Sequence, residues 1–272
     1  MSIGTPRYGA RVPLLYVDVL GVKARWQAGG PERVSAAFAL LEELVGETLD
    51  EVDTAPIAGG VQTDAAALVF DEVEAAVRMG RALFRRAFDR SVEQPEARLW
   101  LRGVISPVES TDELTTESPL RGDGDTLLVR RFSPDLLRAI NVEQSGVKGM
   151  RLLLDQELAG DELSDALVIP IGESGHVLPL KNLSYSLYPE GAGVSEAGYA
   201  DVLWMIPDEV AHWSDWSLQE LKLSKALRGS GRDTYEFTQI AATALTFSET
   251  AAILGAVGLR KTGGLPGVPG ST

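Results

Sequence analysis

The sequence predicts an α+β fold built on a ferredoxin-like sheet with covering helices. An apolar stretch of strand length, "PLLYVDV" at residues 13–19, is followed by an amphipathic helix at 31–52. A hairpin, a second long helix at 73–88 and the strand "ARLWLRGVIS" come next. The order strand, helix, hairpin, helix, strand is that of the ferredoxin-like unit.

Each of these elements has its own pattern. The first strand is apolar on both faces, as a central strand should be. The helix at 31–52 has an acidic outer face, and its apolar residues recur at spacings of three and four: Val34, Phe38, Leu41, Val45 and Leu49. A Gly-rich turn then precedes a strand near 65–70.

The later part of the chain predicts further elements. Residues 109–126 are polar and predict a surface hairpin or loop, and Ser133 followed by Pro134 predicts a helix start. Three segments predict strands: "MRLLLDQEL", "DALVIPI" and "YADVLWMIP". We therefore expect a catalytic domain at 1–210, a C-terminal helical extension at 211–260 and a disordered tail at 261–272.

Composition limits the classes of function and the kinds of metal site that this chain can have. The chain of 272 residues has a formal net charge of −14, which argues against a nucleic-acid-binding face and against docking on anionic membranes. It has no cysteine and only two histidines, His176 and His212, so any metal must be held mainly by oxygen, as Mg²⁺, Mn²⁺ and Ca²⁺ are. Without an apolar run of membrane-spanning length or a signal peptide, the sequence predicts a soluble cytoplasmic protein.

Asp18 is the first candidate for chemistry, because it ends the most apolar strand of the chain. A lone ionised carboxylate there loses several kcal/mol of hydration unless it is paired or bound to a metal. The alternative is that Asp18 caps the following helix or pairs with an arginine.

Asp64 is the second candidate, at the edge of the apolar strand in "GGVQTDAAALVF". Adjacent antiparallel strands would bring it to Asp18, and two carboxylates ~4 Å apart repel by roughly 4 kcal/mol at an effective dielectric of about 20. A divalent cation reverses that cost and would bridge the carboxylates to a triphosphate, with Gly21 letting backbone amides approach the phosphates. The alternative is that Asp64 is only a turn residue.

Cationic and aromatic residues near the end of the chain's central strands are further candidates. Alternation in "RLWLR" puts Arg98, Trp100 and Arg102 on one face, which lines a triphosphate pocket or faces solvent. Trp100 and Trp204 are expected in core or dimer packing.

The order "YVDVLG", "QTDAAALVF", "LRGVIS" and "PDLLRAINVE" resembles the class III nucleotidyl cyclase catalytic domain, over about residues 13–155. The resemblance is greatest to the small bacterial pyrimidine cyclases of the Pycsar antiphage system. It implies a class III cyclase sheet and a homodimer with active sites at the interface.

The resemblance also implies roles for residues. Asp18 and Asp64 would hold two Mg²⁺ or Mn²⁺ ions, with the Val19 carbonyl as a further ligand. Arg138 would stabilise phosphate charge. The substrate-binding residues would be Leu20, Gly21, Lys23, Arg102 and Arg130.

Departures from the family pattern bear on the substrate. Purine cyclases have a base-reading Lys where this chain has Gly60, and an Asn and an Arg where it has Leu137 and Asn141. Arg130 falls near the purine-recognising Asp of the family, and an arginine there suits the acceptor oxygens of uracil. We therefore expect a cyclase that converts UTP, rather than CTP, to cyclic UMP as an antiphage second messenger. The alternatives are a catalytically silent nucleotide sensor and a purine cyclase.

Overall fold

The structure is a computed structural model, which describes residues 11–94, 97–109, 139–140, 149–155, 157–158, 168–170, 199–205 and 243. The predicted loop beyond residue 109 and the helix start at Ser133 lie outside these residues. So do the C-terminal extension and the tail, except for Thr243, which is helical.

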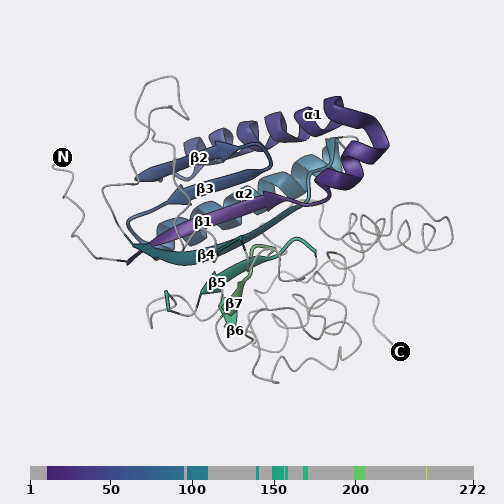
Figure 1. Cartoon of the computed structure of the whole chain (residues 1–272). Helices are drawn as coiled ribbons and strands as arrows, with labels where there is room; N and C mark the ends of the chain where they lie inside the picture. Colours follow the sequence, from purple (N-terminus) through teal and green to yellow (C-terminus); the bar gives the residue numbers. More distant parts are fainter. Residues whose placement is uncertain are drawn as a thin grey trace, which may run out of the picture.

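A seven-stranded sheet organises the described part of the chain, with strand order β2-β3-β1-β4-β5-β7-β6 (Figure 1). All neighbouring strands are antiparallel except β4 and β5. The elements are β1 (Arg11–Val19), α1 (Val22–Glu51), β2 (Ala58–Gln62), β3 (Ala65–Val69), α2 (Val73–Glu93), β4 (Leu101–Glu109), β5 (Leu152–Asp155), β6 (Val168–Pro170) and β7 (Tyr199–Val202). The first four strands with α1 and α2 have the ferredoxin-like order, so the predicted α+β class is confirmed.

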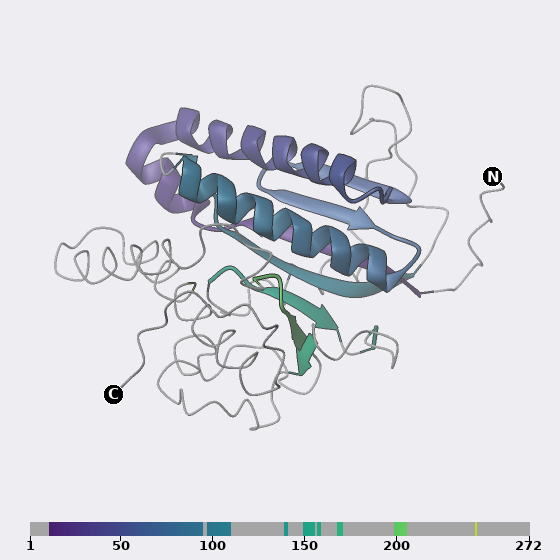
Figure 2. The same cartoon turned by 180° about the vertical axis from the view of Figure 1, so that it is seen from behind.

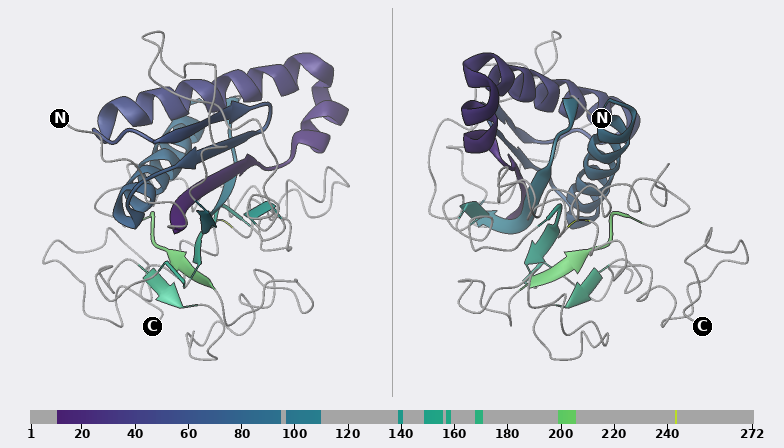
Figure 3. Two further views of the ribbon diagram at one scale, coloured as in Figure 1. Left: turned by 60° about the vertical axis from the view of Figure 1, so that its left-hand side comes forward. Right: turned by 90° about the vertical axis from the view of Figure 1, so that its right-hand side faces the viewer.

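Both helices cover the same face of the sheet, as the view from behind shows (Figure 2). Strand alternation divides the core accordingly. Leu15 and Val17 of β1 point to the helices, whereas Leu14 and Tyr16 point to the opposite face, here called the distal face. In Figure 3, β5, β7 and β6 continue the sheet beyond β4.

Trp204 anchors the end of the sheet to α2. It is 1% exposed, and its ring centroid lies 5.6 Å from that of Phe84 and 6.1 Å from that of Phe88. Its indole N–H donates to the Met150 carbonyl at 3.2 Å. Trp204 and Trp100 are thus core residues, as predicted.

Helix α1 is longer than predicted and has a kink. Gly30 has φ 66° and ψ −161°, a conformation that needs glycine, and Pro31 follows it. The sequence predicts only the part after Pro31, because the residues from Val22 to Gly29 carry no apolar periodicity: Lys23, Trp26 and Gln27 are exposed there. The prediction missed this first segment for that reason.

Strand β2 occupies the place where the sequence suggested a Gly-rich turn. Gly59, inside the strand, has φ 132°, and a Cβ there would lie 2.1 Å from the Ala67 backbone oxygen. The glycines therefore serve a close approach between β2 and β3, and the turn itself comes later, at Thr63 and Asp64.

Ion pairs join the outer sides of α1 and α2. Arg90 binds Glu43 at 2.9 Å and Glu47 at 3.2 Å, while Arg86 binds Glu47 at 2.9 Å and also Glu51. The hydrogen bond to Glu43 is the main cause that raises the pKa of the Arg90 guanidinium above its ordinary value. Neither described helix has an apolar stretch suited to crossing a bilayer.

We expect Gly59→Ala to lower the free energy of unfolding by about 2–4 kcal/mol, because the new Cβ meets backbone in a conformation that disfavours alanine. Gly46→Ala is the matched control. Nothing lies within 4 Å of a Cβ at this helical position, so it should stabilise by about 0.5–1 kcal/mol. Urea unfolding followed by circular dichroism measures both, and an equal effect at the two positions would contradict the assignment of β2.

Glu47→Gln should lower the free energy of unfolding by about 1 kcal/mol at low salt, since Glu47 bridges Arg86 and Arg90. The loss should shrink in about 1 M NaCl, where the Debye length is only about 3 Å. Glu42→Gln, at an exposed position of the same helix, should stay within about 0.5 kcal/mol of the unmodified protein. A loss that does not change with salt would rule out an ionic origin.

Candidate functional site

The predicted site residues that the structure describes gather at one end of the sheet. There β1 ends, α1 begins, the β2–β3 turn closes and β4 starts (Figure 1). Strand pairing and two short connections produce this arrangement, so residues 18–23, 64 and 102 become neighbours without a long loop.

Asp18 is half-buried on the distal face at the end of β1. In the strand registers it lies opposite Ala65 on one side and Arg102 on the other. Directly opposed residues in antiparallel strands share a face, with Cβ atoms about 5 Å apart. Arg102, which is 8% exposed, is therefore the nearest cation to Asp18 by register. Arg102 is therefore the candidate partner for the alternative interpretation, in which Asp18 pairs with an arginine.

Asp64 lies in the β2–β3 turn, as the alternative interpretation expected, and it also lies against the end of β1. Its carbonyl accepts a hydrogen bond from the Val19 amide at 2.7 Å. Its carboxylate Oδ1 is 2.9 Å from the Thr63 hydroxyl. The turn therefore holds Asp64 one register position beyond Asp18, on the neighbouring strand.

The donors at this end of the sheet fit a hard divalent cation. Asp18, Asp64 and the Val19 carbonyl supply oxygen only, which suits Mg²⁺ or Mn²⁺ and excludes the ligand sets of zinc and copper. Within the described ranges no group of three or more acidic or histidine side chains is placed to hold a metal. A cation bound here would complete its shell with water or phosphate oxygens, as Mg²⁺ does at nucleotide sites.

The start of α1 provides a positive end beside these carboxylates. Gly21, the N-cap, is left-handed at φ 80° and makes no side-chain cap hydrogen bond, and the first turn contains no acidic residue. Lys23 is exposed in that turn. The amides of the first helical turn, the helix dipole and a lysine together favour an anion such as phosphate.

The distal face next to Asp18 has a floor of small side chains. Gly60 of β2 lies opposite Ala67 of β3, which in turn lies opposite Tyr16 of β1. Ala65 occupies the next row, beside Asp18. Gln62 of β2 ends this row opposite Ala65, so the small side chains are those of Gly60, Ala65 and Ala67.

Two details of the prediction need correction. Trp100 is buried on the helix side together with Leu99 and Leu101, so it does not share a face with Arg102. The reason is that β4 begins only at Leu101, and alternation does not extend to residues 98–100. Arg98 instead stacks on Trp100, with its guanidinium carbon 5.5 Å from the ring centroid.

The second detail concerns Leu20, which was predicted to bind substrate. Its side chain is 1% exposed in the core, and its amide donates to the Trp100 carbonyl at 2.9 Å. Both groups are thus engaged within the protein, because the chain stays paired with β4 until Gly21 turns it into α1. Arg130 and Arg138, the remaining predicted residues, lie outside the described part of the chain.

The structure adds two residues that the sequence reasoning missed. Thr63 contacts the carboxylate of Asp64, as described above. Arg151, 4% exposed, precedes β5, and its carbonyl accepts a hydrogen bond at 2.9 Å from Gly103, the residue after Arg102. The sequence does contain an indication for Arg151, because alternation along "MRLLLD" puts this residue on the same face as Leu153.

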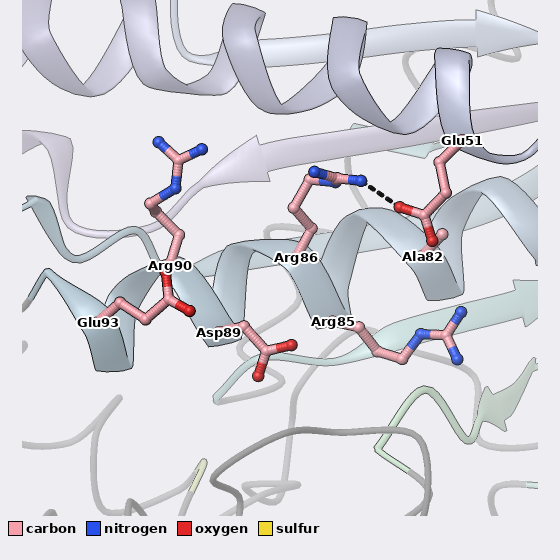
Figure 4. Close-up of a pocket in the computed structure, with 7 residues that line it drawn as sticks. All are labelled: Glu51, Ala82, Arg85, Arg86, Asp89, Arg90 and Glu93. Atoms are coloured by element: carbon pink, nitrogen blue, oxygen red, sulfur yellow. Dashed lines mark hydrogen bonds and ion pairs between the residues drawn. The ribbon is translucent and has the colours of Figure 1, made fainter.

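A surface pocket over α2 is separate from this site. It is lined by Glu51, Ala82, Arg85, Arg86, Asp89, Arg90 and Glu93 (Figure 4). Arg86 reaches across to Glu51 of α1 there, so the lining belongs to the ion pairs between the helices. None of the predicted site residues lines it.

Comparisons with known proteins find similarity in structure but not in sequence. Neither models of protein families nor curated protein sequences match the chain. The guanylyl cyclase Cya2 superposes with a TM-score of 0.44 and 14% identity, covering 72% of this chain and 93% of that one. An adenylate cyclase from Trypanosoma brucei superposes with a TM-score of 0.45 and 15% identity, covering 75% of this chain and 94% of that one.

A bacterial light-regulated adenylyl cyclase gives a TM-score of 0.47 and 10% identity, over 89% of this chain and 59% of that one. All three TM-scores are below 0.5. These similarities therefore do not by themselves show that the chain belongs to a cyclase family.

Proposed function

We propose that the protein is a metal-dependent nucleotidyl cyclase that converts a nucleoside triphosphate to a 3′,5′-cyclic nucleotide and pyrophosphate. One observation carries the proposal: the 2.7 Å hydrogen bond from Val19 to the Asp64 carbonyl, which joins the turn of Asp64 to the strand end of Asp18. Two segments that each carry a carboxylate residue thus meet beside the amino end of α1. Phosphoryl chemistry needs this combination of oxygen ligands and an anion site.

The chain's own groups have distinct roles in this proposal. Asp18 and Asp64, with the Val19 carbonyl, bind the cations; Gly21 and Lys23 receive phosphate oxygens at the start of α1. Arg102, next to Asp18 on β4, neutralises charge on the triphosphate. Bound Mg²⁺ or Mn²⁺ supplies charge neutralisation on the phosphates and favours deprotonation of the ribose 3′-hydroxyl.

A pyrimidine base, uracil in preference to cytosine, is the proposed specificity. Gly60 on the floor of the distal face carries no side chain to read a purine, and Arg130 is the proposed partner of the uracil oxygens. By the resemblance to the Pycsar cyclases, cyclic UMP would act as a second messenger in antiphage defence.

A homodimer is part of the proposal, with Arg138 stabilising the transition state from the partner subunit. Trp26, 57% exposed on the first segment of α1, is the kind of aromatic anchor that interfaces bury. A catalytically silent nucleotide sensor is the second candidate, favoured by Leu137 and Asn141 at the places of the Asn and Arg of active relatives.

Incubation with each of the four NTPs and Mn²⁺ tests the proposal, with products identified by mass spectrometry. We expect cyclic UMP, and Asp64→Ala should lower the rate at least about 100-fold because a metal ligand is lost. Asp71→Ala, which removes an exposed carboxylate beyond the other end of β3, should keep the rate within about twofold. Cyclic AMP or cyclic GMP alone would contradict the pyrimidine specificity, and nucleotide binding without turnover would favour the sensor.

Mixing two inactive variants tests the shared site. Asp64→Ala and Arg138→Ala remove groups that we assign to opposite protomers, so a mixed dimer keeps one complete site. Equal mixing should restore about a quarter of the unmodified rate, since about half of the dimers are mixed and each has one of two sites. No restoration, with subunit exchange verified by size-exclusion chromatography of tagged chains, would contradict the interfacial site.

A further inference from the structure

Thr63 has an unusual backbone conformation directly before Asp64. Its φ is 53°, and among the described residues only Asp53 and Thr63 have a positive φ without being glycine. Aspartate adopts the left-handed region with little cost, but a β-branched residue there is a true outlier. Such strain persists only where the surroundings hold it, and it often accompanies a function.

The Thr63 hydroxyl has two acceptors within reach. Its Oγ1 lies 2.7 Å from the Gln62 carbonyl and 2.9 Å from Asp64 Oδ1. A hydroxyl has one proton to donate, and a carboxylate is the stronger acceptor because the hydrogen bond is charge-assisted. With the backbone in this left-handed conformation, the hydroxyl lies beside the carboxylate of the next residue.

The rest of Asp64 is already fixed. Gln62 and Ala65 are paired across the two-residue turn, and the Val19 amide binds the Asp64 carbonyl at 2.7 Å. Rotation of the half-buried side chain is the freedom that remains, and the Thr63 hydroxyl restricts it.

We propose that Thr63 is a positioning residue, which uses its strained conformation to orient the Asp64 carboxylate for the cation. The inference rests on the metal site of the proposed function. Glycine would relieve the strain at this place but would leave the carboxylate free to rotate. The turn is thus less stable than a turn with glycine at this position, but it has a hydrogen-bond donor beside a metal ligand. Such outer contacts tune the affinity of metal sites.

Mn²⁺ binding to the full chain without nucleotide tests the inference, with free Mn²⁺ measured by electron paramagnetic resonance. Thr63→Val keeps the shape and the strain but removes the hydroxyl, and it should weaken the Asp64-dependent Mn²⁺ affinity about tenfold. Thr63→Ser restores a hydroxyl and should stay within about twofold of the unmodified protein. Thr63→Gly should weaken Mn²⁺ binding as Thr63→Val does while raising the melting temperature, which separates positioning from stability.

Asp64→Ala defines the binding that belongs to this site, because an acidic chain also binds Mn²⁺ weakly elsewhere. Unchanged affinity in Thr63→Val, or an equal loss in Thr63→Ser, overturns the inference while the proposed function stands. If the unmodified protein and Asp64→Ala bind Mn²⁺ alike, the metal site itself is absent and both are overturned.

Discussion

The pairing of β1 on both of its edges is the constraint on which the described structure depends. Antiparallel β3 and β4 hold this strand over its length, and the hydrogen bond between Val19 and Asp64 closes the pairing at its end. A buried strand must satisfy every backbone polar group, so its neighbours cannot shift without cost. That requirement places a carboxylate of β1, a turn and the start of a helix within one small region.

The two faces of the sheet carry different kinds of residues. The helix side carries the large apolar cluster, including Phe84, Phe88 and Trp204, and the ion pairs between α1 and α2 add to it from outside. The distal face carries Asp18 and Arg102 at its end. In the proposed function, a protein of net charge −14 repels a triphosphate at long range, so the cationic groups near Asp18 act locally. Arg102, Lys23 and the amino end of α1 provide that local field.

The sequence predicted the fold well where the patterns were periodic or strongly apolar. β1, α2, β4 and the later strands were expected from such runs, and the place of Asp18 followed from β1 alone. The first segment of α1 was missed because it is short, polar outside and separated by Gly30 and Pro31. β2 was missed because its glycines suggested a turn, although they allow close strand contact instead.

The sequence allowed two interpretations of Asp64, a strand-edge metal ligand and a turn residue, and the structure has it in the β2–β3 turn against the end of β1. Strand pairing is a long-range property, and only the register shows that the turn rather than the strand supplies the carboxylate. The hydroxyl of Thr63 could not be foreseen, since left-handed threonine contradicts ordinary turn preferences.

The two-residue turn between β2 and β3 limits the insertions and deletions that this protein can accept during evolution. Surface turns of hairpins usually accept insertions, because added residues extend into solvent. Here Thr63 and Asp64 are the whole connection between Gln62 and Ala65, and the second of them is bonded to β1. One inserted or deleted residue would move Asp64 away from the end of β1 while leaving both strands intact. Homologues that retain the site should therefore keep the length of this hairpin.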